Sequence, residues 1–438
     1  MQVIKVEPGA RLAGECRVPG DKSISHRAAL LGAIAEGQTE IENFLCGADC
    51  LSTLRCLESM GVGIKQDGGH VRIYGGGLRG LKEPSHILDA GNSGTTMRLL
   101  LGILSGQSFF SVLTGDDSLN ERPMGRVIKP LCQMGAQIWG RKSGLKAPLA
   151  VMGKGQLEPM AYRLPVPSAQ VKSALLLAGL YARGETTVIQ PLPSRDHTER
   201  MLQAFGACLQ VEPDGSARIA GGSSLRGRLV QVPGDISAAA FLIVAATLIP
   251  GSDILIRDVG TNPTRTGVLD VLVQMGADCA LLNERCWSGE PVADLRVRSS
   301  RLRGVEIGGP LIPRLIDEIP IIAVAAAMAE GVTVIRDAAE LRVKETDRIE
   351  AIVKELRKLG AELVGLPDGL SIQGGQALQG ASVDSWGDHR LAMALAVAGL
   401  VTAVSATVIG DTGCTDVSFP GFSSLLSGLG AVIEQSEA

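Results

Sequence analysis

Residues 20–27 read Gly-Asp-Lys-Ser-Ile-Ser-His-Arg and stand directly before an apolar segment of helical composition. Asp21 or Ser23 is expected to cap this helix by accepting hydrogen bonds from its first free amides. Lys22 and Arg27 add positive charge to a helix end that is already positive through its dipole. Such a combination predicts an anion-binding site. The alternative is an ordinary capped surface helix, and the segment alone favours neither interpretation.

Three further polar stretches also precede apolar segments. Residues 91–98 offer small residues, hydroxyls and Arg98, and the glycines let a ligand approach the backbone closely. A turn with a buried arginine is the alternative there. Arg122 is followed by Pro123, which is expected near the first position of a helix, although an arginine in such a place is more often on the surface. Residues 168–170, Ser-Ala-Gln, would be unremarkable as capping residues alone.

The C-terminal half adds carboxylates to the cations. Asp317 and Glu318 are adjacent within a strongly apolar segment. Desolvation raises the pKa of a carboxyl group unless cations compensate, and general bases are tuned in this way. A capping aspartate beside an ion-paired glutamate is the alternative. Residues 341–348 contain five charges, with Asp347 placed to cap a helix, and residues 388–390, Asp-His-Arg, open another apolar helix where unpaired charge is costly.

These stretches together predict a site for several anionic groups. The cations concerned are Lys22, Arg27, Arg98, Arg122, Lys344, Arg348 and Arg390. They occur in both halves of a chain whose net charge is −4. The five histidines show no metal-ligand spacing, so we expect no metal.

Composition excludes several classes of function. A net charge of −4 and an aromatic content of 3% argue against nucleic-acid binding. The N-terminus does not have the pattern of a signal peptide, and no apolar run reaches the roughly 18–20 residues of a membrane span. The nine cysteines are scattered, without zinc-site spacing, as expected of free thiols in a reducing compartment. We therefore expect a cytoplasmic protein that acts on small molecules and binds neither nucleic acid nor membranes. We also expect a monomer, although the composition itself does not give the oligomeric state.

One sequence pattern recurs six times: a leucine, two variable residues, an apolar residue, a glycine, a small residue, and an apolar residue two positions later. Its glycines are Gly61, Gly135, Gly206, Gly276, Gly360 and Gly430. Each copy is typical of the last turn of an amphipathic helix, a glycine C-cap and a strand. The fourth copy is the least regular, because Cys279 stands where an aliphatic residue is expected.

A second pattern, a polar opening followed by an apolar helix and a strand, alternates with the first. The apolar helices are hydrophobic nearly all round, which predicts that they are buried with sheets outside them. The fold class is therefore α/β (α+β), with six units of helix, strand, helix and strand, three in each of two domains. We expect domain I to comprise residues 1–16 and 232–438 and domain II residues 17–231. The crossings lie near residues 14–20 and 226–234, and the first strand returns to the C-terminal half.

The motifs resemble those of the enolpyruvyl transferases, in the same order and over essentially the whole chain. The matching motifs are Gly20-Asp21-Lys22-Ser23 with Arg27, Gly91-Asn92-Ser93-Gly94-Thr95 with Arg98, Glu121-Arg122-Pro123, Lys344-Glu345-Thr346-Asp347-Arg348 and Asp388-His389-Arg390. Each motif is weak alone, but five in this order are highly specific.

The resemblance implies a two-domain inside-out α/β barrel, with three βαβαββ-type repeats in each domain and closure of the domains on ligand. It implies transfer of the enolpyruvyl group of phosphoenolpyruvate to the 5-hydroxyl of shikimate 3-phosphate, with release of phosphate. Two phosphates and two carboxylates must be bound together, which suits bidentate arginines. The reaction moves protons and no electrons, so no redox cofactor or metal is implied.

The resemblance also implies roles for individual residues. Shikimate 3-phosphate would be held by Lys22, Ser23, Arg27, Ser168, Ala169, Gln170, Asp317 and Lys344. Phosphoenolpyruvate would be held by Lys22, Gly94, Arg122, Gln170, Arg348 and Arg390. Asp317 would be the base for the 5-hydroxyl, and Glu345 with Lys22 would handle the proton at the enol carbon.

Two positions distinguish this chain within the family. Val417 stands where some members carry a phosphate-binding lysine, and Gly94 is the small residue of glyphosate-sensitive members. Two rival functions are an enolpyruvyl transferase acting on UDP-N-acetylglucosamine and a non-catalytic anion-binding scaffold of the same fold. The first carries Lys-Asn and a reactive loop cysteine, whereas this chain has Lys22-Ser23 and no evident loop cysteine. Intact Asp317 and Glu345 argue against the second.

Overall fold

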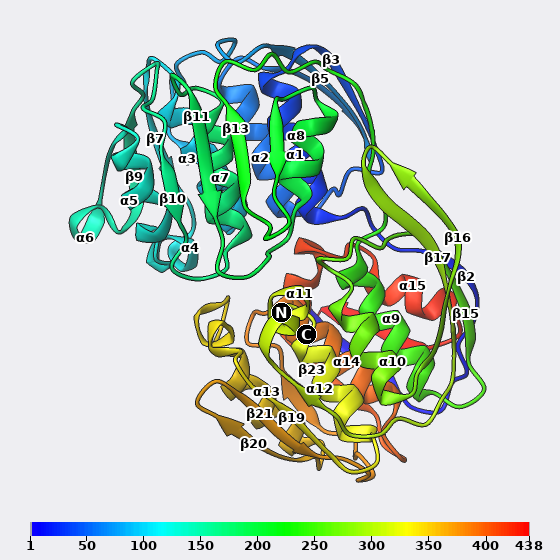
Figure 1. The fold of residues 1–438 in the computed structure, drawn as a ribbon. Coiled ribbons are helices and arrows are strands. Elements are labelled where there is room, and N and C mark those ends of the chain that lie inside the picture. Colours follow the sequence, from blue (N-terminus) through cyan, green and yellow to red (C-terminus); the bar gives the residue numbers. More distant parts are fainter. Residues whose placement is uncertain (1, 438) are drawn as a thin grey trace. The chain divides into compact units, whose positions relative to one another are not determined.

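The computed structural model describes residues 2–437 and divides into two compact units (Figure 1). Unit 1 comprises residues 2–19, Pro233–Arg285 and residues 291–437. Unit 2 comprises Gly20–Val232 and Cys286–Glu290. Each unit has its own hydrophobic core, so each is stabilised by its own buried apolar surface.

Unit 2 contains helices α1 to α8 and strands β3 to β14. The helices are α1 (Lys22–Ile34), α2 (Ala48–Ser59), α3 (Gly94–Ser105), α4 (Asp117–Glu121), α5 (Gly125–Gln133), α6 (Arg141–Gly144), α7 (Ala169–Gly179) and α8 (His197–Ala204). The strands are β3 (Glu36–Glu42), β4 (Gly63–Asp67), β5 (His70–Gly76), β6 (Leu88–Asp89), β7 (Phe110–Thr114), β8 (Gln137–Gly140), β9 (Lys146–Met152), β10 (Ala161–Arg163), β11 (Glu185–Ile189), β12 (Leu209–Val211), β13 (Ala217–Ala220) and β14 (Leu229–Gln231).

Unit 1 contains the remaining elements. Its helices are α9 (Ile236–Leu248), α10 (Gly267–Met275), α11 (Ile312–Leu315), α12 (Ile319–Met328), α13 (Arg348–Lys358), α14 (His389–Leu400) and α15 (Phe422–Gly428), with 3₁₀ turns η1 (Gly309–Leu311), η2 (Ala339–Val343) and η3 (Thr412–Val417). Its strands are β1 (Gln2–Glu7), β2 (Ala13–Arg17), β15 (Asp253–Gly260), β16 (Asp278–Trp287), β17 (Glu290–Arg298), β18 (Glu306–Ile307), β19 (Val332–Ile335), β20 (Glu362–Leu366), β21 (Gly369–Gln373), β22 (Ser382–Asp384), β23 (Thr407–Gly410) and β24 (Val432–Glu437).

The described strands form six four-stranded sheets that follow one plan. The orders are β14-β3-β5-β4, β6-β7-β9-β8 and β10-β11-β13-β12 in unit 2, and β2-β15-β17-β16, β18-β19-β21-β20 and β22-β23-β1-β24 in unit 1. In each sheet the first pair is parallel and the next pair is antiparallel. The N-terminal strand β1 completes the sheet made by the last strands of the chain. The six-unit fold predicted from the sequence is therefore confirmed.

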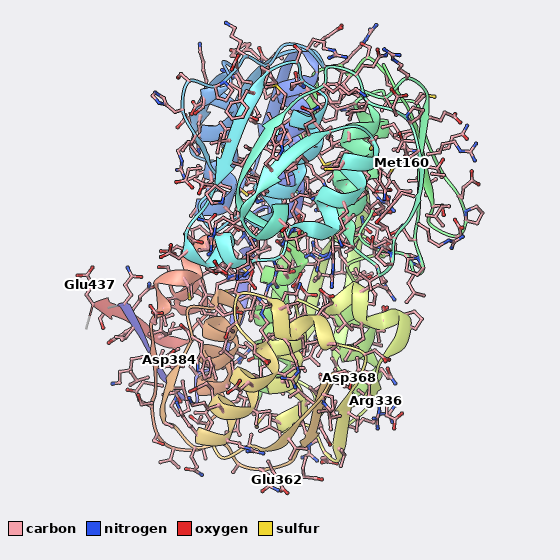
Figure 2. All side chains as sticks on the ribbon, turned by 90° about the vertical axis from the view of Figure 1, so that its left-hand side faces the viewer. Met160, Arg336, Glu362, Asp368, Asp384 and Glu437 are labelled. Carbon is pink, nitrogen blue, oxygen red and sulfur yellow. The ribbon has the colours of Figure 1, made fainter. Side chains whose placement is uncertain are left out.

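Three apolar helices lie side by side inside each unit, with the strands outside them: α1, α3 and α7 in unit 2, and α9, α12 and α14 in unit 1 (Figure 1). In α12 every residue from Ile319 to Ala327 is buried, as expected of a helix that is apolar all round. The outer faces of the sheets carry charged residues together with some exposed apolar ones, such as Val364 of β20. Glu362 of β20 and Glu437 of β24, for example, are exposed (Figure 2). The six sequence repeats thus place apolar helices in the two cores and charge on the outside.

The six recurrent glycines end the six amphipathic helices as predicted. All six have positive φ, between 80° at Gly61 and 110° at Gly430. In each copy the residue after the glycine donates its backbone amide to the carbonyl of the leucine five positions earlier, as Ala361 does to Leu356. This is the Schellman type of helix end, which favours glycine because a Cβ is strained at positive φ.

Close packing of α3 against α7 predicts a stability effect at Gly102. A Cβ added there would lie 2.3 Å from the carbonyl oxygen of Ala174 in α7, so the two helices would have to separate. We expect Gly102→Ala to lower the free energy of unfolding by roughly 1–3 kcal/mol, measured by urea denaturation. Gly428→Ala is the matched control, because a Cβ at that position of α15 meets no described atom within 4 Å. Equal stability of the two variants would contradict the close approach.

Candidate active site

The first polar opening forms the N-terminus of α1. Asp21 caps this helix by accepting from the amide of Ile24 at 2.9 Å. The ammonium of Lys22, half-buried, donates to the Asp49 carboxylate of α2 at 3.2 Å. Asp49 therefore fixes Lys22, the lysine assigned to both substrates from the sequence. Nothing in the sequence around Asp49 indicated this role.

Arg27 lies one turn further along α1 and is buried. Its guanidinium donates to Thr198 Oγ1 at 2.6 Å, to Ser173 Oγ at 2.8 Å and to the carbonyl oxygen of Ser23 at 2.9 Å. Burial lowers the pKa of Arg27 to about 10, so the side chain still carries its charge at neutral pH. A charged arginine held mainly by neutral oxygens retains its attraction for an anionic group.

Arg98 and Gln170 connect the amino ends of α3 and α7. Arg98 Nη1 donates to Gln170 Oε1 at 2.6 Å, and Gln170 Nε2 donates to Thr95 Oγ1 at 3.0 Å. Ser93 and Ser168 cap the two helices through their hydroxyls. These residues belong to two of the motifs predicted from the sequence, and the structure brings them together.

Arg122 lies in the connection between α4 and α5. The helix expected near Pro123 begins at Gly125, and α4 ends directly before Arg122, so this arginine is not at the start of a helix. Its Nη2 atom donates to Asn92 Oδ1 at 2.6 Å, which places it beside the opening that contains Gly94. A Cβ added at Gly94 would lie 3.6 Å from Arg122 Nη1.

A chain of buried hydroxyls runs beneath these openings. His26 Nδ1 and Thr53 Oγ1 are 2.7 Å apart, Thr53 and Thr96 share a hydrogen bond of 2.7 Å, and Thr96 donates to Ser93 Oγ at 2.8 Å. Burial, together with the charges of Lys22 and Arg27, lowers the pKa of His26 well below its usual value. The imidazole is therefore neutral, and the chain links α1, α2 and α3 without adding charge.

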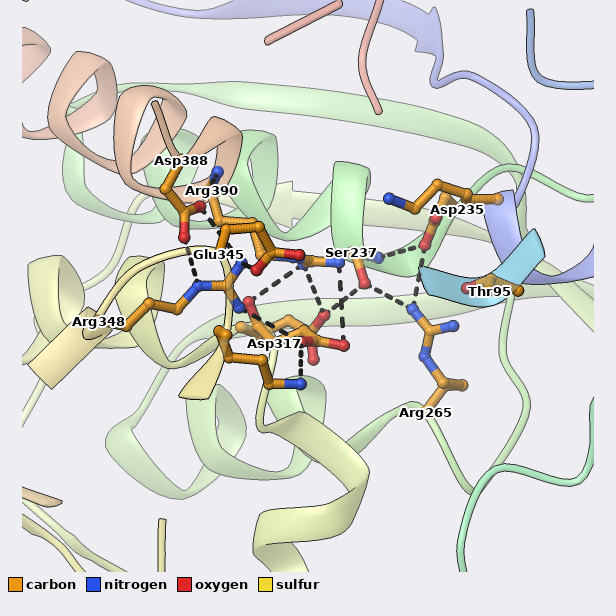
Figure 3. Close-up of polar contacts among 12 residues, drawn as sticks. Thr95, Asp235, Ser237, Arg265, Asp317, Glu345, Arg348, Asp388 and Arg390 are labelled. Atoms are coloured by element: carbon orange, nitrogen blue, oxygen red, sulfur yellow. Dashed lines mark hydrogen bonds and ion pairs between the residues drawn. The ribbon is translucent and has the colours of Figure 1, made fainter. Parts of the chain in front are cut away.

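Arg348, at the start of α13, is the centre of the unit 1 cluster (Figure 3). Its side chain is only 1% exposed. It contacts Asp388 at 2.7 and 3.2 Å, Glu345 at 2.7 Å and Asp317 at 3.4 Å. Burial alone would lower the pKa of Arg348, but the three carboxylates outweigh it and raise the pKa. Burial likewise opposes ionisation of Asp388, yet the Arg348 charge lowers the pKa of that carboxyl group.

Asp317 lies at the junction of the cations of unit 1. Its carboxylate lies 3.2 Å from Lys344 Nζ, 3.4 Å from Arg348 Nη1 and 4.0 Å from Arg390 Nη2 (Figure 3). The half-buried carboxylate thus has cations on several sides. Such surroundings stabilise its ionised form, which is the form that can accept a proton.

Arg390, in the first turn of α14, contacts the segment before α12. Its Nη1 atom donates to the carbonyl oxygen of Asp317 at 3.1 Å and lies 3.3 Å from Glu318 Oε1. Glu318 also accepts a short hydrogen bond from Ser237 Oγ at the start of α9. Ser237 in turn accepts from the buried Arg265 (Figure 3). The amino ends of α9, α12 and α14 are linked through these groups.

Sequence reasoning missed part of this cluster. Arg265 follows Thr-Asn-Pro-Thr in a turn before α10. Arg122 also lies in a turn before a helix, so the same reasoning could have identified Arg265 from the sequence. Ser237 carried no signal beyond helix capping. Val417, which the sequence analysis singled out, is half-buried at the end of η3. Within residues 2–437, no group of three or more His, Cys, Asp or Glu side chains could hold a metal ion, and no helix could span a membrane.

Most of the residues assigned from the sequence therefore lie at or beside helix amino ends within each unit, and Arg122, between α4 and α5, is an exception. Unit 2 holds Lys22, Ser23, Arg27, Gly94, Arg122, Ser168, Ala169 and Gln170, and unit 1 holds Asp317, Lys344, Glu345, Arg348 and Arg390. The first set offers cations and amides for anionic groups. The second set adds two carboxylates beside fixed cations, which can move protons.

Comparison with known proteins identifies the family. A sequence model described as EPSP synthase (3-phosphoshikimate 1-carboxyvinyltransferase) matches residues 6–426. A protein named 3-phosphoshikimate 1-carboxyvinyltransferase from Desulforamulus reducens is 57% identical over 422 residues, covering 96% of this chain and 98% of its own. One of the same name from Synechocystis sp. is 59% identical over 418 residues, covering 94% and 93%. A solved EPSP synthase from Acinetobacter baumannii, 46% identical, matches with a TM-score of 0.91 over 100% of both chains. This chain belongs to the EPSP synthase family.

Proposed function

We propose that the protein transfers the enolpyruvyl group of phosphoenolpyruvate to the 5-hydroxyl of shikimate 3-phosphate and releases phosphate. This is a step toward chorismate and the aromatic amino acids. Membership of the EPSP synthase family supports the proposal, as do the names of relatives that match nearly the whole chain. The reaction converts an enol phosphate and an alcohol into an enol ether and inorganic phosphate.

The observation that carries the proposal is the contact of both predicted proton-transfer carboxylates with one buried cation. Arg348 contacts Glu345 at 2.7 Å and Asp317 at 3.4 Å. A non-catalytic anion-binding protein would gain nothing from two carboxylates beside its arginines, because each carboxylate repels an anionic ligand. In an enzyme the same arrangement orients a base and an acid around the reacting carbons.

The proposal assigns binding roles as the family resemblance implies. Shikimate 3-phosphate contacts Lys22, Ser23, Arg27, Ser168, Ala169, Gln170, Asp317 and Lys344. Phosphoenolpyruvate contacts Lys22, Gly94, Arg122, Gln170, Arg348 and Arg390. Support comes from the fixed orientations of these side chains, since Arg27 donates to Thr198, Arg98 to Gln170 and Arg122 to Asn92.

The proposed chemistry is an addition followed by an elimination. The 5-hydroxyl oxygen bonds to the enol carbon and its proton passes to Asp317, while the methylene carbon gains a proton from the pair formed by Glu345 and Lys22. In the second step the new methyl group returns a proton to that pair, the double bond re-forms, and phosphate leaves with the electron pair of its carbon–oxygen bond. Charge builds up and disappears beside fixed cations, so the surrounding groups need little rearrangement.

We also infer that the protein acts as a cytoplasmic monomer on these two small molecules, without nucleic-acid or membrane partners. The net charge of −4 and the scarcity of aromatic residues support the part of this inference that concerns nucleic acid.

Phosphate release tests the function directly. With phosphoenolpyruvate present, we expect phosphate to be released when shikimate 3-phosphate is added and not when UDP-N-acetylglucosamine is added. The reason is that the first motif carries Lys22-Ser23, unlike the transferases that use the sugar nucleotide. Turnover with UDP-N-acetylglucosamine but not with shikimate 3-phosphate would support the rival transferase instead. No turnover with either acceptor would support a non-catalytic anion-binding scaffold.

Asp317→Asn tests the base. The amide keeps the size of the side chain but cannot accept the hydroxyl proton, so we expect kcat to fall by about 10²–10⁴-fold. Calorimetry should show that shikimate 3-phosphate still binds, because Lys344 and Arg348 lose a competing carboxylate. Asp270→Asn, which alters an exposed pair with Arg314, is the control and should keep wild-type kcat. A kcat for Asp317→Asn within threefold of wild type would exclude Asp317 as the base, because it corresponds to a change in activation free energy of only ~0.65 kcal/mol.

Gly94→Ala tests the position of phosphoenolpyruvate. We expect glyphosate to compete with phosphoenolpyruvate in the wild type, and the inhibitor concentration for half-inhibition to rise by about tenfold or more in the variant. The added Cβ would lie 2.7 Å from Arg98 Nη1 and 3.6 Å from Arg122 Nη1, so it would narrow the space beside these arginines. Gly428→Ala should remain sensitive. Equal inhibition of wild type and Gly94→Ala would refute the assignment.

A further inference from the structure

Glu318 is a buried carboxylate to which the proposed function gives no role. It occupies the N-cap position of α12, but its side chain makes no capping hydrogen bond. The side chain is 0% exposed. Its Oε1 atom accepts from Ser237 Oγ and lies 3.3 Å from Arg390 Nη1, and its Oε2 atom has no hydrogen-bond partner among the described residues. Burial of an ionised carboxylate is costly unless a cation compensates, so its contact with Arg390 needs an explanation.

Glu318 and its neighbour Asp317 have different surroundings. Asp317 is half-buried and is shared among Lys344, Arg348 and Arg390, so losing one cation leaves it with others. For Glu318 the ion pair that the structure shows is the one with Arg390, and its other contact is a hydroxyl. The side chain is thus suited to holding one particular guanidinium.

Arg390 is held from one side by the segment before α12. Its Nη1 atom contacts the carbonyl oxygen of Asp317 at 3.1 Å and Glu318 Oε1 at 3.3 Å. The Arg390 side chain is 10% exposed, so little of it is free to move in solvent. These two acceptors fix the plane of the guanidinium, and bidentate recognition of a carboxylate or phosphate depends on that plane.

Ser237 supports Glu318 from the amino end of α9. A hydroxyl has one proton, and Ser237 donates it to Glu318 while accepting from Arg265 Nη2 at 2.5 Å. Arg265 also contacts Asp235 at 3.2 Å. Both described contacts of Glu318 are therefore donors, as an ionised carboxylate requires. The series Arg265, Ser237, Glu318 and Arg390 orients the last guanidinium through buried groups whose own positions are fixed.

We propose that Glu318 is a positioning residue for phosphoenolpyruvate: by holding Arg390 through the buried contact at Oε1, it sets the orientation in which that arginine binds this substrate. The inference rests on the proposed function, in which Arg390 binds phosphoenolpyruvate. Glu318 itself touches no substrate and transfers no proton. Glu318 therefore changes the affinity for phosphoenolpyruvate alone, and it does so only through the orientation of Arg390.

Glu318→Gln tests this role with little change of volume. The amide oxygen still accepts from Ser237, but the charge that holds Arg390 is lost. We expect the KM for phosphoenolpyruvate to rise about tenfold, the size of one charge-assisted hydrogen bond. The KM for shikimate 3-phosphate should stay within about twofold and kcat within about threefold, because an interaction equal in ground and transition states changes KM alone.

Glu355→Gln is the matched control. Glu355 is another carboxylate of unit 1 whose side chain is 0% exposed, and it bonds to Lys358 at 2.6 Å and to Trp386 Nε1 at 2.9 Å, away from Arg390. A purely structural effect of neutralising a buried carboxylate should appear in both variants. Thermal unfolding of both, followed by circular dichroism, confirms that each is folded under the assay conditions. We expect only Glu318→Gln to change the KM for phosphoenolpyruvate.

A double-mutant cycle with Arg390→Lys shows whether Glu318 acts through Arg390. A lysine keeps the charge but cannot be oriented as a planar fork, so Glu318→Gln should change the KM for phosphoenolpyruvate by less than about twofold in that background. Additive effects, or a parallel rise in the KM for shikimate 3-phosphate, would overturn the positioning role. So would an unchanged KM in an active Glu318→Gln enzyme. An inactive wild type would instead refute the proposed function, and with it this inference.

Discussion

The buried guanidinium of Arg348 is the group on which the unit 1 cluster depends. A cation with 1% exposure is stable only because Asp388, Glu345 and Asp317 surround it. The Asp388 carboxylate pairs with Arg348 and also caps α14, so one side chain both compensates the Arg348 charge and fixes the start of a helix. The same guanidinium orients Asp317 and Glu345, the two carboxylates to which the proposed reaction assigns proton transfer. Loss of Arg348 would therefore leave three carboxylates without their shared cation.

The repeats explain why charges can gather at helix ends without disturbing the cores. The inner helices are mainly apolar along their length, and their charged side chains lie near the amino end, as in α12, where the buried residues from Ile319 onward follow Asp317 and Glu318. The outer amphipathic helices end at glycines with positive φ, so the chain turns back into a strand at the same point in every copy. One supersecondary plan used six times thus presents six polar helix openings, and differences among the openings give each its own chemistry.

The two units hold their cations with different sets of contacts. In unit 2, Arg98 donates to Gln170, Arg122 to Asn92 and Arg27 largely to hydroxyls, while Lys22 pairs with the Asp49 carboxylate. In unit 1 the arginines are held by carboxylates, which balance the charge and stiffen the cluster. This division suits a proposed reaction that needs both strong attraction for phosphate groups and carboxylates placed to accept and return protons.

The sequence by itself determined the repeat and the chemistry of its openings. Glycine C-caps, capping aspartates such as Asp21, and helices apolar all round are local or periodic features, so they can be read without a structure. Only the tertiary structure decided which side chains meet. Glu318 with Arg390 and Ser237, and Lys22 with Asp49, are contacts between segments far apart in the chain. Their partners follow from how the helices of each unit pack, and helix packing is fixed by the shape of a whole core, which no single motif contains.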